Sequence, residues 1–154
     1  PGNLRIGGNE EDLAFAREVV AMAREHGVRL ALENSALWLV ERGLQKVEGL
    51  AFCLDTGHTY LNELRPGDRR GSIKTYLDAF KERLVHLHIQ DMIPEGDHYT
   101  VGTGLTPQAD WEYMLQTLQD IRFSGAWVFE IRPRPPLVTA RDSVKFLEGL
   151  RATG

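Results

Sequence analysis

The chain has 154 residues, of which 42% are hydrophobic and 26% charged, and its net charge at pH 7 is -4. These values are typical of a soluble globular protein, and the acidic balance argues against nucleic acid or an anionic membrane as a partner. The single cysteine, Cys53, excludes an internal disulfide, and no apolar run has the length of a membrane span. We therefore expect one cytoplasmic domain covering residues 1–154.

The first predicted elements alternate between helix and strand. Residues 9–26 carry apolar side chains at helical spacing, with Asn9 placed to cap the start and Gly27 to end the helix. A short apolar run over 28–34 predicts a strand, 35–48 a second helix, and 50–58 a second strand with its turn.

The same order continues through the second part of the chain. A polar loop over 62–72 precedes a helix over 73–84 and a third strand over 84–90. A long loop then runs to Thr106 and Pro107, which we expect to cap and begin a helix. A fourth strand covers 126–133, and Thr139 is expected to cap a final helix. Strands separated by helical crossovers predict parallel pairing in an α/β fold.

The two faces of each predicted strand differ in chemistry. One face is bulky and apolar, with the pairs Leu30 and Leu32, Phe52 and Leu54, Val85 and Leu87, and Trp127 and Phe129. The other face ends in a metal-ligand or acid–base side chain in all four strands: Glu33, Asp55, His88 and Glu130. Functional sites of parallel α/β folds lie at the carboxyl ends of the strands, so we expect these four side chains to converge.

Three carboxylates in contact need a positive counter-charge, because like charges raise one another's pKa. A divalent cation supplies it, and an oxygen-rich set with one imidazole suits Mn²⁺ or Mg²⁺, with Co²⁺ or Zn²⁺ as further options. The alternative is that each acid separately caps a helix or turn. Their shared position at strand ends favours one metal site.

Four segments carry a resemblance to a known group of proteins. "LALEN", "CLDTGH", "HLHIQD…GDHYTVGTG" and "WVFEI" resemble the strand ends of the xylose isomerase-like TIM-barrel superfamily. The resemblance covers residues 9 to 150. That group includes sugar isomerases, ketose 3-epimerases and endonuclease IV-type phosphodiesterases. The resemblance implies that Glu33, Asp55, His88 and Glu130 are metal ligands, that Glu33 and Glu130 exchange protons with substrate, and that His58 contacts substrate hydroxyls.

Further residues lie close to the predicted site. His98 occupies a position that often faces substrate in this superfamily, although a plain polar loop is the alternative. Arg132 alternates away from Glu130, but the following prolines bend the chain and permit contact at the rim. Asp91 could orient a histidine or cap its own loop. The glycines of "VGTG" indicate a close backbone approach.

The chain accounts for half of a TIM barrel, which needs eight strands and about 250 residues. We expect a parallel (β/α) half-barrel of four strands that corresponds to the latter part of the barrel. Its open strand edges invite pairing, either with a second copy in a homo-oligomer or with a missing N-terminal half. The sequence leaves open whether it is a fragment or a natural half-barrel.

The predicted activity is that of a metal-dependent isomerase or epimerase of a sugar or sugar phosphate. A proton would be removed next to a metal-bound carbonyl to give an enediolate and then returned. One alternative is a non-catalytic half-barrel that acts as an assembly or binding module. Another is an endonuclease IV-type phosphodiesterase, against which the adjacent Asp97 and His98 argue, since that group spaces the two by one residue. A ketose 3-epimerase would have an arginine near the position of Pro94, so this proline argues against that assignment.

Overall fold

A computed structural model of the chain describes residues 8–59, 71–132 and 136–153. The predicted loop at 62–72 therefore lies mostly outside the described residues. None of the helices in the described part of the chain is both long and apolar enough to cross a bilayer.

Four parallel strands form the central sheet, as the order of elements predicts. They are β1 (Ala31–Glu33), β2 (Ala51–Asp55), β3 (Leu84–Ile89) and β6 (Ala126–Phe129), paired in the order β1-β2-β3-β6. Glu33 lies opposite Cys53, Asp55 opposite His88, and His88 opposite Val128. This register brings the carboxyl ends of all four strands to one rim of an α/β half-barrel.

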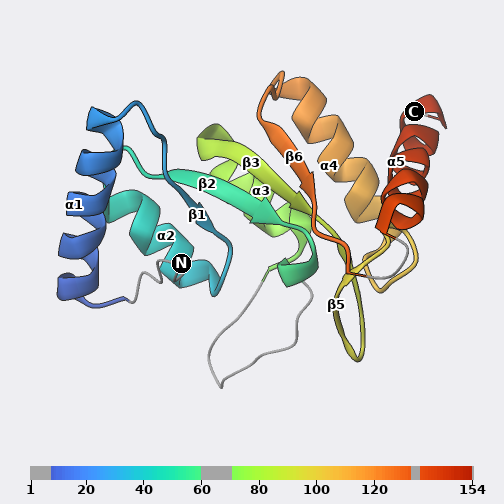
Figure 1. Ribbon diagram of the computed structural model, residues 1–154, viewed down its shortest axis with the longest axis horizontal. Helices are drawn as coiled ribbons and strands as arrows, with labels where there is room; N and C mark the ends of the chain where they lie inside the picture. Colours follow the sequence, from blue (N-terminus) through green and yellow to red (C-terminus); the bar gives the residue numbers. More distant parts are fainter. Residues whose placement is uncertain (1–7, 60–70, 133–135, 154) are drawn as a thin grey trace.

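The helices follow the strands. They are α1 (Glu10–Glu25), α2 (Leu37–Lys46), α3 (Ile73–Phe80), α4 (Gln108–Asp120) and α5 (Pro136–Thr153), with the short helices η1 (Gly57–Thr59) and η2 (Lys81–Arg83). Figure 1 shows α3 behind β2 and β3, and α4 beside β6. The N-cap prediction for the first helix is confirmed, because Oδ1 of Asn9 accepts a hydrogen bond from the Asp12 N–H at 2.8 Å.

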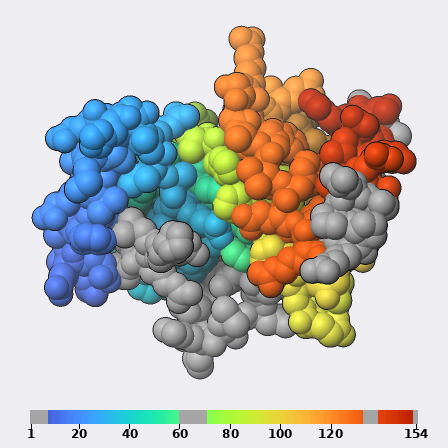
Figure 2. Space-filling model, in the orientation of Figure 1, coloured from blue at the N-terminus to red at the C-terminus, as the bar shows by residue number. Residues whose placement is uncertain are grey.

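Only one face of the sheet packs into the hydrophobic core. Phe52, Leu54, Leu87 and Ile89 are fully buried there, together with Trp111 of α4. Among the described residues the opposite face is not covered by helices, and Val128 on it is 40% exposed. In Figure 2 the green and teal atoms of the central strands are visible in a recess between the blue N-terminal part and the orange β6 segment. The open face is where a closed barrel would have its interior.

Both helix caps expected from threonine are wrong. Pro107, not Thr106, is the N-cap of α4, and the Thr106 Oγ1 has no hydrogen-bond partner in the described ranges. The last helix begins at Pro136, so Thr139 lies inside it and its carbonyl accepts a hydrogen bond from Ser143. A proline at the start of a helix loses no hydrogen bond, since the first-turn N–H groups have no partner within the helix.

Two further differences concern the third strand. Val85 was expected in the core but lines the open face beside Cys53 and His86. The register shifts between Phe52 and Cys53, so that Leu84 pairs with Phe52 and takes the core position. The long loop after β3 contains an antiparallel hairpin, β4 (Asp91–Ile93) and β5 (Gly96–Tyr99).

Candidate active site

The four side chains predicted to converge do lie together at the carboxyl ends of the strands. Nδ1 of His88 is 3.1 Å from Oε2 of Glu33, 3.3 Å from Oε1 of Glu130 and 4.0 Å from Oδ2 of Asp55. One ligand atom each from Asp55, His88 and Glu130 fall within 4.8 Å of one another. The same holds for Glu33, Asp55 and His58. The side chains therefore form one cluster, because Asp55 belongs to both sets.

Asp55 is the fully buried centre of this cluster. Its backbone N–H donates to Oδ1 of Asn34 at 2.5 Å, and its carbonyl accepts from Nδ2 of Asn34 at 3.0 Å. The carboxylate accepts from the amide of Gln90 at 2.8 Å on both oxygens and from the N–H of His58 at 3.1 Å. These contacts hold the carboxylate in one orientation, as expected of a side chain that orients a ligand or metal.

His58 follows β2 and lies against two of the carboxylates. Its Nδ1 is 2.8 Å from Oε1 of Glu33 and 3.5 Å from Oδ2 of Asp55. Its Nε2 is 3.6 Å from Oδ2 of Asp97, on the β4–β5 hairpin. His58 is thus part of the cluster, where it can serve as an additional metal ligand or as a contact to substrate.

The β4–β5 hairpin brings His98 to the same place. Nε2 of His98 is 3.5 Å from Oε2 of Glu130, and its Nδ1 is 2.6 Å from Oδ1 of Asp97. The backbone of His98 has a φ of 70°, a left-handed conformation that costs free energy in a non-glycine residue. Its carbonyl accepts from the N–H of Arg132 at 2.9 Å. Arg132 therefore contacts the hairpin through its backbone, and the residue is exposed.

The electrostatics of the cluster combine burial with close opposite charges. Burial raises the pKa of Glu33, but the contacts with His58 and His88 outweigh it and lower the pKa to about 2. Contacts with Cys53 and Glu33 raise the pKa of His88 to about 11. Burial raises the pKa of Asp55 although His58 acts in the opposite direction. Burial alone would raise the pKa of Asp97, but the contact with His98 acts in the opposite direction, and the pKa is lowered overall.

The donor set fits a divalent cation. Nδ1 of His88 is buried and, despite its short distances to the carboxylates, forms no hydrogen bond within the described part of the chain. A buried ring nitrogen without such a partner, close to oxygens of three carboxylates, is compatible with a metal ligand. Below it, a hollow of about 360 Å³ on the open face is lined by Glu33, Cys53 and His88, among others.

Asp91 does not orient a histidine but holds the glycine-containing loop. Its fully buried carboxylate accepts from the N–H groups of Met92, Gly102, Gly104 and Thr106 at 2.8–3.2 Å. A Cβ on Gly104 would lie 2.2 Å from the carbonyl oxygen of Met92. The predicted close backbone approach of "VGTG" is confirmed.

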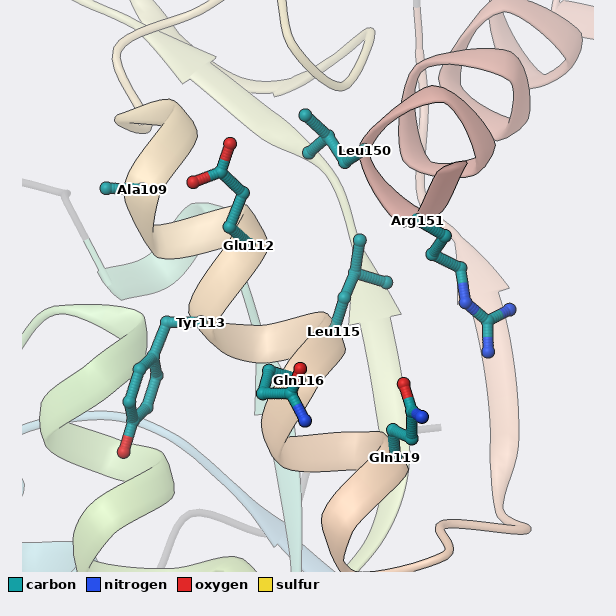
Figure 3. A pocket seen from close by; sticks show the side chains of 8 residues that line it. All are labelled: Ala109, Glu112, Tyr113, Leu115, Gln116, Gln119, Leu150 and Arg151. Atoms are coloured by element: carbon teal, nitrogen blue, oxygen red, sulfur yellow. The ribbon is translucent and has the colours of Figure 1, made fainter. Parts of the chain in front are cut away.

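A second concave surface lies between α4 and α5. This groove of about 550 Å³ is lined by side chains such as Glu112, Gln116 and Gln119 of α4 and Leu150 and Arg151 of α5 (Figure 3). None of the clustered carboxylates and imidazoles lines it. It offers no group of acids and bases comparable to the rim, so the candidate site is at the strand ends.

Sequence reasoning missed three residues of the site. Asn34 and Gln90 bind Asp55 across 21 and 35 residues, and Asp97 lies between His58 and His98. The position of Asn34 directly after Glu33 was a usable signal, because an amide at a strand end can bind the neighbouring strand. Nothing local to Gln90 indicated its partner.

The family of xylose isomerase-like TIM barrels matches residues 13–150. Three solved structures have a similar fold. A 3-keto-D-glucoside 4-epimerase from E. coli gives a TM-score of 0.66 at 20% identity, over 97% of this chain and 56% of that one. A D-tagatose 3-epimerase-like protein gives a TM-score of 0.68 at 18% identity, over 94% of this chain and 56% of that one. D-Psicose 3-epimerase from Clostridium cellulolyticum gives a TM-score of 0.59 at 21% identity, over 93% of this chain and 55% of that one. The chain spans about half the length of these structures, and no curated protein sequence matches it significantly.

Proposed function

The chain belongs to the xylose isomerase-like TIM barrel family, and we propose that it is a divalent-metal-dependent isomerase or epimerase acting on a sugar or sugar phosphate. The observation that carries the proposal is the convergence of Glu33, Asp55 and Glu130 on the buried Nδ1 of His88, which has no hydrogen-bond partner among the residues that the structure describes. The similar epimerase structures support the substrate class.

Glu33, Asp55, His88 and Glu130 would hold the metal ion. The predominance of carboxylate oxygens favours Mn²⁺ or Mg²⁺, and the imidazole also permits Co²⁺ or Zn²⁺. When bound, such an ion polarises a substrate carbonyl and makes the adjacent C–H more acidic.

Glu33 and Glu130 are the proposed acid–base residues. One carboxylate removes a proton from the carbon next to the carbonyl, giving an enediolate, and a carboxylic acid returns a proton. A return to the other face of the same carbon gives epimerisation, and a return to the neighbouring carbon gives an aldose–ketose isomerisation. His58 lies beside Glu33 and His98 beside Glu130. With Arg132, they are the proposed contacts to substrate hydroxyls.

We further propose that four more parallel strands complete the pocket. The chain spans about half the length of the similar structures, and in the described residues one face of the sheet is not covered by helices, with Val128 of β6 40% exposed on it. A second copy of this chain or an N-terminal half of the barrel would cover that face. Solution mass and metal content, measured on one sample, separate these arrangements.

The test of the activity is exchange of a substrate C–H with solvent deuterium. The purified chain is incubated in D₂O with Mn²⁺ and a panel of aldoses, ketoses and their phosphates. Metal-dependent incorporation of deuterium next to a carbonyl is expected, and Glu130→Gln should abolish it. Glu112→Gln, which changes an exposed glutamate of α4, is the matched control. Metal binding without any exchange would favour the binding module, and exchange retained by Glu130→Gln would overturn the role of Glu130.

A further inference from the structure

Gln90 joins the carboxylate cluster to the β4–β5 hairpin, although it bears no charge and is fully buried. Its Nε2 donates to both oxygens of Asp55 at 2.8 Å. Its Oε1 accepts from the N–H of His98 at 2.5 Å. One side chain therefore contacts two parts of the candidate site that are on different elements.

The backbone of Gln90 is itself tied to the end of β2. Its N–H donates to Oγ1 of Thr56 at 2.9 Å, and its carbonyl accepts from the same hydroxyl at 2.6 Å. Because Thr56 follows Asp55 directly, these bonds fix the amide of Gln90 relative to the carboxylate that it binds.

The chemistry of the position requires a long primary amide. Asp55 needs donors and the His98 N–H needs an acceptor, and a glutamine amide supplies both in one planar group. Glutamate would place a second carboxylate against Asp55 without a donor, and asparagine is one methylene shorter. Since Asp55 and Gln90 are fully buried, a missing partner for either side chain would be costly.

Gly57 makes room for this amide. A Cβ on Gly57 would lie 2.6 Å from both Cδ and Oε1 of Gln90, which is closer than real contacts allow. The glycine in "LDTGH" thus has a packing reason, because any side chain there would push the amide away from Asp55 or His98.

We propose that Gln90 is a positioning residue that couples the orientation of the Asp55 carboxylate to the placement of the hairpin. Its two bonds to Asp55 leave Oδ2 directed at the imidazoles of His58 and His88, 3.5 and 4.0 Å away. Its bond to the His98 N–H supports the left-handed backbone there and thereby keeps the His98 imidazole 3.5 Å from Glu130. The first role rests on the proposed metal-dependent function, and the second does not.

The experiment compares the wild-type chain with Gln90→Met, which keeps the length of the side chain and removes both the donor and the acceptor of the amide. The Kd for Mn²⁺ is measured by calorimetry, and amide hydrogen exchange of residues 96–99 is measured without metal. Loss of a residue that orients a metal ligand typically weakens metal binding by about 10–100-fold. We expect a rise of that size in Kd together with faster exchange in the hairpin.

Ser143→Ala is the matched control. Ser143 is also fully buried, and its hydroxyl bonds Val101 and Thr139 rather than the cluster. This variant should unfold at a lower temperature than wild type yet keep its Kd for Mn²⁺. All affinities are compared at a temperature at which circular dichroism shows every variant folded.

Gly57→Ala provides an independent approach should Gln90→Met fail to fold, because it displaces the amide without changing it. It should weaken Mn²⁺ binding and loosen the hairpin in the same way, and the double variant should be no worse than Gln90→Met alone. Wild-type values in either single variant, or a change in only one of the two properties, would overturn the coupling. If the wild-type chain bound none of Mn²⁺, Mg²⁺, Co²⁺ and Zn²⁺, the metal-dependent function and the proposed coupling would both be refuted. The exchange rates would then decide only whether Gln90 holds the hairpin.

Discussion

Replacement of Asp91 by asparagine should destabilise the chain strongly, although Asp91 is not a proposed metal ligand. Oδ1 accepts from the N–H groups of Met92 and Thr106, and Oδ2 from those of Gly102 and Gly104. In either orientation, an asparagine would present its NH₂ group to two N–H donors. Two hydrogen bonds to a charged acceptor are lost, and two buried or part-buried donors remain without a partner.

Each buried donor without a partner costs about 1–3 kcal/mol, so Asp91→Asn should lower the free energy of unfolding by about 2–6 kcal/mol. For a domain of this size, the midpoint of thermal unfolding would fall by at least about 4 °C. The measurement is urea and thermal denaturation followed by circular dichroism, with a chelator present so that metal binding does not contribute.

The control is Asp120→Asn at the exposed end of α4, where the carboxylate accepts a hydrogen bond from the Gln116 side chain. Its effect should stay within about 0.5 kcal/mol, as for most surface substitutions. A change of less than about 0.5 kcal/mol for Asp91→Asn would show that the four N–H groups find other partners. The argument from buried donors would then be refuted.

Three other outcomes follow from the cluster and the core. The pKa of Glu33 is about 2 in the folded chain, below its ordinary value. The metal-free chain should therefore lose stability as pH falls from about 5 towards 2. In the Glu33→Gln variant, the free energy of unfolding should depend less on pH in that window. The pKa of His88 is about 11, so its charge stabilises the metal-free fold fully below about pH 6.5, and this contribution is lost as pH rises towards 11. Mn²⁺ binding at pH 7.5 should therefore release about one proton, detectable by calorimetry in buffers of different ionisation enthalpy, and an unchanged binding enthalpy across buffers would contradict this. Leu87→Ala in the core should cost about 2–5 kcal/mol in urea unfolding, against less than about 1 kcal/mol for Val144→Ala on α5.

Much of the candidate site was predictable because it depends on local rules. The alternation of side chains along a strand placed Glu33, Asp55 and His88 on one face, and Glu130 directly after β6. The parallel order of the strands placed all four at one rim. Neither inference needs the distance between any two residues, so both could be made from the order of residues alone.

Details of the loops could not be obtained in this way. The β4–β5 hairpin forms in a segment without a regular apolar pattern, and His98 takes a backbone conformation that a non-glycine residue rarely adopts. Thr106 and Thr139 looked like helix caps, but a proline begins or precedes the helix in both places. Threonine and proline are both common at helix starts, so local preference alone does not choose between them.

The sequence by itself determined the α/β order, the polar face of the sheet and the identity of the four converging side chains, because each follows from residue type and a two-residue period. Only the tertiary structure decided which groups support them. The bonds from Asn34 and Gln90 to Asp55 and the contact of His58 with Asp97 join residues 21 to 39 positions apart. Such pairs depend on the register of neighbouring strands and on the path of the hairpin, which arise only when the whole sheet has assembled.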